Sequence, residues 1–410
     1  MLKLQGSLAN YAWGSTTAIP ALLEQAPTDE PIAEMWFGAH EARPSQVVWS
    51  SPASEQAYGV AVLPRTLSDI IAESPAAVLG EESVKTFGPR LPFLMKLLAA
   101  DKALSIQVHP DLEQAQEGFA RENAAGIPLD SPHRNYRDAW HKPELIYALS
   151  PFDALTGFRE PRAIAATVDR LLDAEVPGTH AALLTWREVL AGENPLRDSM
   201  NLLLGTPGFG AVADRLAAAD IAEASPECAS RIGCDIDPVE ILRMTNGDFP
   251  SDAGALVALM LNMVRMLPGQ ALAMSAGIPH AYLRGLGVEI MASSDNVVRG
   301  GLTSKHIDIP ELQRLVRFEV QKPHIQHADN SGRLDTGCRD FGLQVISCAD
   351  NLQLGEEGPT IVLCTSGSFQ VSTGHGTQQL QPGDAYFIGA DEAPAAFTGQ
   401  GALFVGGLGR

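Results

Sequence analysis

The sequence predicts a mainly β fold with an inserted α-helical domain, and three observations support this prediction. Pro and Gly recur every 8–15 residues through residues 1–100, and β-branched or aromatic stretches such as 46–49 lie between them. That pattern is typical of a β-sandwich or barrel. Apolar residues then recur at helical spacing between about residues 160 and 267, and strand-like patterns return after Leu267.

The ends of these patterns divide the chain of 410 residues into three expected domains. Residues 1–158 together with 240–320 form the β domain that carries the chemistry, residues 159–239 form the helical insertion, and residues 321–410 form a second β domain. A chain of this length exceeds what one compact core usually holds.

Individual segments add detail to this division. Residues 91–98 and 104–109 are expected to be two strands joined by a turn at 100–102. In the insertion, Ile164, Val168 and Leu171 recur at helical spacing, as do Leu183, Trp186 and Leu190. The apolar run at 255–266 predicts a buried helix, since it is too short to span a bilayer.

A possible internal repeat links the two β domains. Pro268-Gly269 is followed by an apolar stretch and then by Pro279-His280, and Pro382-Gly383 is followed by an apolar stretch and then by Pro394-Ala395. Each Pro-Gly turn leads to a strand and a second Pro, which suggests one β-barrel unit used twice. Ala395 then stands where His280 stands, so the C-terminal unit is expected to have no metal ligand there.

Composition excludes several classes of function. The net charge of −20 argues against a general nucleic-acid binder, which needs a basic surface. The N-terminus lacks the apolar core of a signal peptide, and the five cysteines are scattered without a CxxC pair. We therefore expect reduced thiols in a cytoplasmic protein that is a monomer and has no nucleic-acid or membrane partner.

Four residues from distant segments have the chemistry of a metal site. Gln107 and His109 are one residue apart on a predicted strand, so both side chains face the same way. Glu144 and His280 add a carboxylate and a second imidazole. Each residue taken alone is more simply explained as a solvent-facing or structural side chain. Together they make a mixed nitrogen and oxygen site suited to zinc, and also to manganese or iron.

Charged residues after residue 285 suggest an acid–base site that receives an anion. Glu289 and Asp295 are candidate proton-transfer groups, and the Arg299 guanidinium is a fixed donor for an oxyanion or phosphate. His141 and Lys142 flank the metal segment, and Lys305 follows Arg299. The alternative explanation is a charged loop over the mouth of a barrel.

These segments resemble the type I mannose-6-phosphate isomerases, which are zinc-dependent members of the cupin superfamily. The resemblance covers most of residues 10–160 and 235–310. Its most specific strings are SIQVHP at 105–110, HKPE at 141–144, GIPHAY at 277–282 and SDNVVRGGLT at 294–303. It also includes YAWGS at 11–15, AEMWFGAH at 33–40 and LPFLMK at 91–96, whereas Gly300 replaces the commoner Ala.

The resemblance implies cupin-type jelly-roll β-barrels and one Zn²⁺ per chain. It implies that the metal ligands are Gln107, His109, Glu144 and His280 and that Arg299 is catalytic. The residues expected to line the substrate pocket are Trp13, Lys96, Ser105, Lys142 and Lys305. The implied reaction interconverts mannose 6-phosphate and fructose 6-phosphate through an enediol, in mannose metabolism leading toward GDP-mannose.

The base that moves the proton between C1 and C2 stays open at this point. Glu289 is the first candidate and Asp295 the second, with His141 or Lys142 available for ring opening. Two other functions also stay open. One is a metal-dependent isomerase of a non-phosphorylated sugar, and the other is a non-catalytic bicupin that binds a metal and a sugar.

Overall fold

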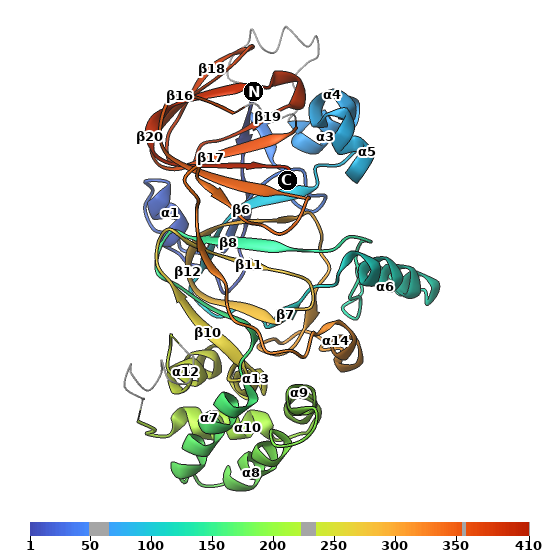
Figure 1. The fold of residues 1–410 in the computed structure, drawn as a ribbon, viewed down its shortest axis with the longest axis vertical. Helices are drawn as coiled ribbons and strands as arrows, with labels where there is room; N and C mark the ends of the chain where they lie inside the picture. Colours follow the sequence, from blue (N-terminus) through green and yellow to red (C-terminus); the bar gives the residue numbers. More distant parts are fainter. Residues whose placement is uncertain (49–64, 223–234, 355–357, 410) are drawn as a thin grey trace.

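The computed structural model describes residues 1–48, 65–222, 235–354 and 358–409. The strands of the described residues form two sheets (Figure 1). One sheet occupies the middle of the molecule, and the other lies at the end farthest from the main group of helices. The mainly β prediction with an inserted helical region is therefore confirmed.

The central sheet is antiparallel and is organised around one long strand, β12 (His280–Ala292). The second half of β12 pairs with β6 (Phe93–Ala100) and β8 (Glu144–Ala148), whereas its first half pairs with β9 (Phe152–Phe158) and β7 (Gln107–Val108). Strand β12 thus brings distant segments of sequence to one place. The remaining strands are β2 (Ser7–Ala9), β3 (Glu34–Phe37), β10 (Leu261–Met266), β11 (Gln270–Met274), β13 (Val298–Arg299) and β14 (Ile325–His327).

The second sheet contains the C-terminal strands together with strands from the N-terminus. Its order is β15-β16-β20-β17-β19-β1-β4-β5, with β18 paired to β17. The bounds are β1 (Leu2–Gln5), β4 (Gln46–Val48), β5 (Arg65–Thr66), β15 (Arg333–Leu334), β16 (Gly342–Leu354), β17 (Thr360–Thr373), β18 (Gly376–Leu380), β19 (Ala385–Ile388) and β20 (Ala395–Gly407).

This membership departs from the predicted domain range of 1–158. Strand β1 pairs with β19 through Lys3↔Tyr386, and β4 and β5 continue the same sheet. A pairing between residues almost 400 positions apart depends on tertiary structure, and the local pattern could not reveal it. The predicted strand at 46–49 is confirmed as far as Val48, and Trp49 lies outside the described residues.

The main helical region lies between β9 and β10. It contains α7 (Pro161–Asp173), α8 (His180–Val189), α9 (Pro195–Gly205), α10 (Phe209–Ala218), α12 (Pro238–Asp248) and α13 (Gly254–Ala258). The helices therefore continue past the expected boundary at 239. Helix α12 begins there because Asp237 caps it, accepting a hydrogen bond from the Val239 amide, and Pro238 occupies its first turn.

The buried helix predicted at 255–266 is wrong in its second half. Helix α13 ends at Ala258, and Leu261–Met266 forms β10, which pairs with β9. A continuous apolar run is compatible with either a buried helix or a buried strand, so its pattern alone does not choose between them.

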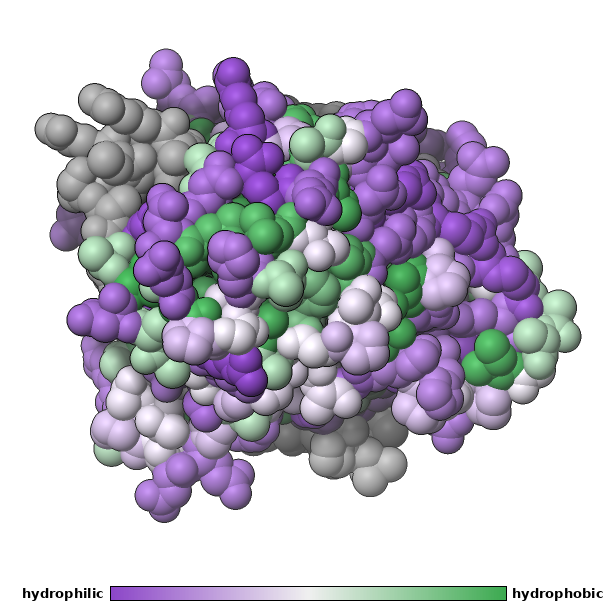
Figure 2. All heavy atoms as spheres, turned by 90° about the horizontal axis from the view of Figure 1, so that it is seen from below, coloured by the Kyte–Doolittle hydropathy of each residue, from purple (hydrophilic) through white to green (hydrophobic). Residues whose placement is uncertain are grey.

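The helices pack around one apolar core. Ile164, Val168 and Leu171 on α7 are buried together with Leu183 and Trp186 on α8, as their spacing predicted. Figure 2 shows the end face of the molecule below these helices, where hydrophobic residues are visible between hydrophilic ones. None of the described helices is both long enough and apolar enough to cross a membrane.

Several elements near the N-terminus were not predicted as such. Short helices follow β5, and the first begins at a capping box in which Thr66 and Asp69 bond reciprocally. The predicted hairpin of 91–98 with 104–109 is wrong, because β6 and β7 each pair with β12 and not with each other. The described α-helices outside the main helical region are α1 (Ala18–Leu22), α3 (Leu67–Glu73), α4 (Pro75–Leu79), α5 (Glu81–Phe87), α6 (Leu112–Ala124) and α14 (Ile309–Leu315).

The two sheets share part of one core. Met95 on β6 and Ile290 on β12 are buried with Phe404 and other residues of the C-terminal sheet, and Gly406 lies directly against both side chains. A Cβ atom at Gly406 would lie 2.5 Å from the Met95 methyl group, so a larger residue there would require the Met95 and Ile290 side chains to shift. Cys338, Cys348 and Cys364 are free thiols, whereas Cys228 and Cys234 lie outside the described residues.

Candidate metal centre

Three of the predicted ligands meet at the point where β7, β8 and β12 come together. Glu144 is the first residue of β8, His280 is the first residue of β12, and His109 directly follows β7. One ligand atom from each residue lies within 4.8 Å of the others, and all three side chains are buried. The Nε2 atoms of His109 and His280 each lie 3.3 Å from a different Glu144 oxygen.

Backbone carbonyls fix the orientation of both imidazoles. The Nδ1 atom of His109 lies 2.7 Å from the carbonyl oxygen of Asn296, and the Nδ1 atom of His280 lies 2.9 Å from that of Ile278. A carbonyl can only accept, so Nδ1 of each ring donates to it and Nε2 is the nitrogen left for a metal. Each Nε2 therefore faces Glu144 as a potential ligand atom.

The protonation of His109 also suits a metal ligand. Burial lowers its pKa to about 4, although the neighbouring Glu144 carboxylate acts in the opposite direction. Its Nε2 atom is buried and has no hydrogen-bond partner among the described residues. An unpartnered lone pair in a buried place is costly unless something binds it, and a metal ion would do so.

The fourth predicted ligand, Gln107, lies beside these three. It is the cross-strand neighbour of His280 on one side and of Arg299 on the other. It also lines the same cavity as Glu144 and His280. Two imidazole nitrogens, a carboxylate and an amide oxygen form a donor set that fits zinc.

Glu144 is held in its charged form. Burial alone would raise its pKa, but Lys142 and His109 more than offset this, so the pKa lies well below its usual value. The Lys142 Nζ atom is 2.9 Å from one Glu144 oxygen. An ionised carboxylate beside neutral imidazoles is the state that binds a divalent cation.

The ligands open onto a cavity of about 50 Å³. Its other walls combine buried charges with apolar groups. The lining residues are Glu34, Lys96, Leu98, Leu104, Gln107, Lys142, Glu144, His280, Ala281, Tyr282 and Glu289. A cavity of this size that is lined by polar groups can hold water or the reacting end of a small ligand.

A buried chain of alternating charges forms one wall. The Lys96 ammonium lies 3.2 Å from a Glu34 oxygen and 3.0 Å from a Glu289 oxygen. The second Glu34 oxygen accepts a hydrogen bond from the Trp36 indole at 2.8 Å. Burial alone would lower the pKa of Lys96, but Glu289 and Glu34 raise it, so the ammonium stays charged.

Glu289 has the perturbation expected of a general base. Burial raises its pKa, Lys96 lowers it, and the nearby Glu144 and Glu34 carboxylates raise it further, with a net rise. A carboxylate with a raised pKa in a cavity accepts a proton more readily than an exposed one. Strand register places Glu289 directly opposite Lys96 on the neighbouring strand.

Arg299 and Lys305 lie beside this cavity and not in its wall. Arg299 is on β13, next to Gln107 on β7. Its pKa is lowered by burial and by Arg137, and the pKa of Lys305 is lowered by burial and by both arginines. The three cations are therefore close neighbours. Within the described part of the chain, none of them forms an ion pair with a carboxylate.

Two other predicted catalytic residues have partners away from the cavity. Asp295 pairs with His40 at 3.4 Å, and the pair lowers its pKa although burial acts against this. The His141 Nε2 atom is 2.9 Å from an Asp340 oxygen. Neither Asp295 nor His141 is among the residues that line the cavity.

The remaining predicted substrate residues lie at the rim. Trp13 and Leu104 pack against the apolar cluster that contains Tyr282. Ser105 is half-buried, two residues before Gln107. Both positions are near the cavity, although neither residue lines it.

Sequence reasoning gave no role to three residues that the structure places at the site. Glu34 is the second carboxylate partner of Lys96, and Tyr282 lines the cavity with a hydroxyl that lacks a partner among the described residues. Asn296 holds His109 through its carbonyl. A charged Lys96 within an otherwise apolar strand was the available signal that a buried carboxylate partner must exist.

Comparisons with known proteins agree with this geometry. A model of the family "Phosphomannose isomerase type I, catalytic domain" matches residues 1–161. The mannose-6-phosphate isomerase of Escherichia coli (strain K12) is 37% identical over 412 residues, which cover 98% of each chain. The human mannose-6-phosphate isomerase is 30% identical, covering 96% of this chain and 94% of its own.

The chain belongs to the type I phosphomannose isomerase family. Solved structures of family members share the whole fold. A zinc-bound mannose 6-phosphate isomerase superposes with a TM-score of 0.85 at 36% identity, covering 100% of this chain and 99% of the other. A lysine-to-alanine mutant of the phosphomannose isomerase from Salmonella typhimurium gives a TM-score of 0.86 at 35% identity, with 100% of both chains covered.

Proposed function

We propose that this chain is a zinc-dependent isomerase that interconverts mannose 6-phosphate and fructose 6-phosphate. The observation that carries the proposal is the buried cluster of His109, Glu144 and His280. This cluster lies beside a cavity that is also lined by Lys96 and the candidate base Glu289. Relatives named for this activity match nearly the full length of the chain. One relative with a solved structure is a zinc-bound mannose 6-phosphate isomerase.

Gln107, His109, Glu144 and His280 would hold the ion. When bound, zinc supplies a Lewis acid next to the sugar oxygens that gain negative charge during the reaction. The protein contributes the placement: two imidazoles held by backbone carbonyls and one ionised carboxylate. Lys96, Glu144 and Glu289 are buried around the cavity, which strengthens the electrostatic interactions among them.

Glu289 is the candidate base for the transfer of a proton between C2 and C1. The aldose loses the C2 proton to a carboxylate, an enediol forms, and the same carboxyl group returns the proton to C1. Glu289 lines the cavity and has a raised pKa, and both properties suit this role. Lys96, hydrogen-bonded to Glu289, would stabilise its ionised form at the start of each turnover.

Lys142 is placed to exchange the proton of a sugar oxygen. Its ammonium lines the cavity and lies 2.9 Å from a Glu144 oxygen, so it is close to the ligands. Asp295 and His141 are less well placed, since both are paired outside the cavity. We propose that these two support the site's structure and do not exchange protons with substrate.

Arg299 and Lys305 would bind the phosphate. They lie beside the cavity without carboxylate partners in the described chain, as an anion site requires. An isomerase of a neutral sugar would gain nothing from them, so the phosphorylated substrate is favoured. Arg299→Ala should therefore lower kcat/KM for mannose 6-phosphate while leaving the thermal midpoint of unfolding nearly unchanged.

The test combines metal analysis of purified protein with a coupled isomerase assay. We expect one zinc per chain, activity on mannose 6-phosphate, loss of activity after chelation and recovery on adding zinc. Activity on mannose equal to that on mannose 6-phosphate would instead favour an isomerase of unphosphorylated sugars. Full metal loading with neither activity would favour a binding protein. We further propose that the protein is cytoplasmic and monomeric.

A further inference from the structure

We propose that Arg137 is a third cation of the phosphate subsite and that the Tyr136–Glu311 contact sets its position. This inference rests on the proposed function, because it names a residue that receives the phosphate of the same substrate. The argument depends on two segments that carry the cations. The first is residues 131–137, which we call the Arg137 arm, and the second is residues 299–311, which we call the Arg299 arm.

The Arg137 arm is anchored next to the metal centre. The Arg137 backbone amide donates to the Asn296 side-chain oxygen at 2.7 Å, and Asn296 lies three residues before Arg299. The backbone carbonyl of Asn296 accepts the Nδ1–H of His109. One buried asparagine therefore holds both a metal ligand and the backbone of Arg137, which fixes their separation.

Arg137 is exposed, and its charge acts on two other cations. It is one of the groups that depress the pKa values of both Arg299 and Lys305, after burial. Among the described residues, Arg137 forms no ion pair. Asp295 also lies near Arg137, but its ion pair is with His40. Three neighbouring cations that form no ion pair among the described residues are unexpected in a chain with a net charge of −20, unless an anion binds between them.

Buried contacts hold the two arms together. The Tyr136 ring is 1% exposed, its hydroxyl donates to Glu311 on α14, and Arg121 on α6 pairs with Glu311 at 2.8 Å. The Tyr136 amide donates to the buried Glu122 carboxylate at 2.9 Å. These groups take no part in the proposed proton transfers, so we assign them a structural role that fixes the distance between the two arms.

Two further contacts join the arms nearer the solvent. The rings of His133 and His306 meet edge to face with centroids 4.6 Å apart, and the Asn135 amide donates to Asp308 at 2.9 Å. Successive residues of one arm thus contact successive residues of the other. Because Arg137 ends one arm and Arg299 and Lys305 begin the other, these contacts set the gap between the cations.

The chemistry of the ligand follows from this arrangement. A phosphate monoester carries close to two negative charges near neutral pH and has three oxygens that accept hydrogen bonds. Three donors from two arms match it better than a carboxylate or a neutral hydroxyl. Since Asn296 links the Arg137 arm to the metal ligand His109, a sugar phosphate can place its phosphate between the arms and its reactive carbons in the cavity.

The first experiment compares Arg137→Gln with Arg162→Gln, which makes the same charge change at an exposed position on α7. We expect Arg137→Gln to raise KM for mannose 6-phosphate by about 10- to 100-fold, the range for loss of one charge-assisted hydrogen bond. We expect kcat and zinc content to stay within about two-fold, and Arg162→Gln to resemble the unaltered protein. An unchanged KM in Arg137→Gln overturns the assignment.

Inorganic phosphate separates this inference from the proposed function. Calorimetric titration of the zinc-loaded protein with phosphate should show binding that Arg137→Gln weakens by a similar factor. If the unaltered protein binds phosphate in this way but lacks isomerase activity, the proposed function fails and the subsite stands. If isomerase activity is present and phosphate binding is equal in both proteins, the subsite fails alone.

The positioning role has its own test in Tyr136→Phe, which removes only the hydroxyl. We expect KM for mannose 6-phosphate to rise by about three- to ten-fold with kcat unchanged, since one hydrogen bond to a charged group is lost. In the double variant with Arg137→Gln, Tyr136→Phe should add little. A purely structural hydroxyl would lower stability without this change in KM and without the loss of additivity, and that result would overturn the positioning role.

Discussion

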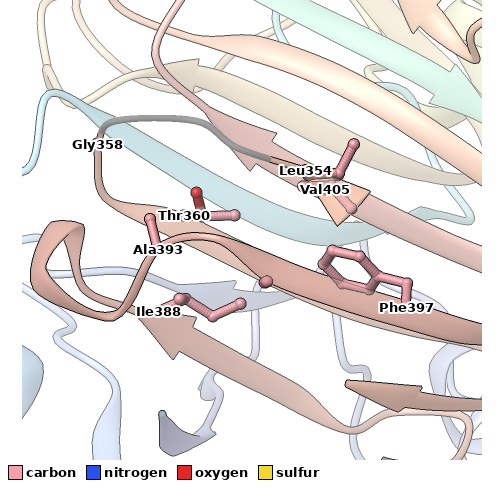
Figure 3. A pocket seen from close by; sticks show the side chains of 8 residues that line it. Leu354, Gly358, Thr360, Ile388, Ala393, Phe397 and Val405 are labelled. Carbon is pink, nitrogen blue, oxygen red and sulfur yellow. The ribbon is translucent and has the colours of Figure 1, made fainter. Parts of the chain in front are cut away.

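The two β units of this molecule have equivalent cavities with opposite linings. In the central sheet the cavity holds the metal ligands and the charged wall. In the C-terminal sheet the corresponding cavity is about 10 Å³, barely the space of one water, and it is lined by apolar and small side chains from β16, β17, β19 and β20 (Figure 3). The predicted repeat is confirmed, since β12 and β20 each begin directly after the second Pro.

Strand register identifies the equivalent positions. His280 begins β12 opposite Gln107, and Ala395 begins β20 opposite Leu354. Glu144 begins β8 opposite Met274, the last residue of β11, just as Thr360 begins β17 opposite Ile388, the last residue of β19. The C-terminal unit therefore has Ala, Leu and Thr where the central unit has His, Gln and Glu.

The charged residues Lys96 and Glu289 in the cavity wall also have equivalent positions in the C-terminal unit. Glu289 lies opposite Lys96 and also opposite Ile146, two residues into β8. Val405 lies opposite Gln344 and also opposite Val362, two residues into β17. A buried ion pair in one unit is thus replaced by Val and Gln in the other. Likewise, Phe397 stands two residues after Ala395, as Tyr282 stands two residues after His280.

The comparison teaches that this β fold does not require the buried charges. Desolvating an ammonium and two carboxylates costs several kcal/mol per ion, which their mutual attraction only partly offsets. The C-terminal unit avoids that cost with an apolar interior. Departures from an apolar core at one of two equivalent places indicate function there. Four substitutions, from the largest expected effect to the smallest, test this conclusion.

His280→Ala copies the residue of the C-terminal unit into the metal centre. Removing a residue that hydrogen-bonds to a metal ligand usually lowers metal affinity about 10- to 100-fold, and removing the ligand itself should lower it further. We expect little bound zinc by elemental analysis and isomerase activity near background. His327→Ala, at an exposed position on β14, is the control and should keep both. Full zinc occupancy in His280→Ala would remove His280 from the ligand set.

Lys96→Gln copies Gln344 into the charged wall. It leaves Glu34 and Glu289 buried without their cation, which should lower the free energy of unfolding by about 3–5 kcal/mol. The double variant Lys96→Gln with Glu289→Val copies both residues of the C-terminal unit and should recover part of that stability without activity. Urea unfolding measures both, and a double variant no more stable than Lys96→Gln would contradict the equivalence.

Glu34→Gln tests the electrostatics of the base without removing Lys96. The Glu34 carboxylate helps to raise the pKa of Glu289, so its neutralisation should lower that pKa. Because the base acts when deprotonated, the acidic limb of the kcat/KM profile should move to lower pH. The amide oxygen can still accept from the Trp36 indole. Glu193→Gln, at an exposed position, is the control. If Glu34→Gln moved the acidic limb to higher pH or left it unchanged, that result would argue against Glu289 as the base.

Tyr282→Phe copies Phe397 and should have the smallest effect on stability. The Tyr282 hydroxyl is buried and has no hydrogen-bond partner among the described residues, so its removal leaves no other group unpaired. We expect the free energy of unfolding to change by less than about 1 kcal/mol. Any larger loss in urea unfolding would show that the hydroxyl has a structural partner. A fall in kcat at unchanged stability would place it against the substrate.

The candidate metal ligands could be named from the sequence because their residue types combine into one nitrogen and oxygen site and their segments resemble one family, whereas no single residue was decisive. Gln107 and His109 are one residue apart on an extended segment, and His280 follows a Pro that begins a strand, so each motif implied its own orientation. The repeat was also visible, since a Pro-Gly turn needs a positive φ and Gly269 and Gly383 have φ values of 95° and 89°. The absence of a ligand at Ala395 could be read from the same alignment.

Other parts of the site could not be predicted, because they depend on pairings between distant strands. Glu34 becomes a partner of Lys96 only when β3 lies beside β6, and Asp340 meets His141 only when the C-terminal segment packs against the segment before β8. The same is true of β1, which joins the C-terminal sheet. The apolar run at 255–266 divided into helix and strand because β9 offered hydrogen bonds to its second half.

The sequence by itself determined the mainly β architecture, the helical insertion and the candidate ligands His109, Glu144 and His280, which the structure brings together. Each of these follows from residue type and short-range spacing. Tertiary structure alone decided that Glu289 is buried beside Lys96 and that Asp295 pairs with His40. It also decided that Arg137, Arg299 and Lys305 are neighbours that form no ion pair among the described residues. Burial and long-range charge set proton affinity, and neither exists until the strands have assembled.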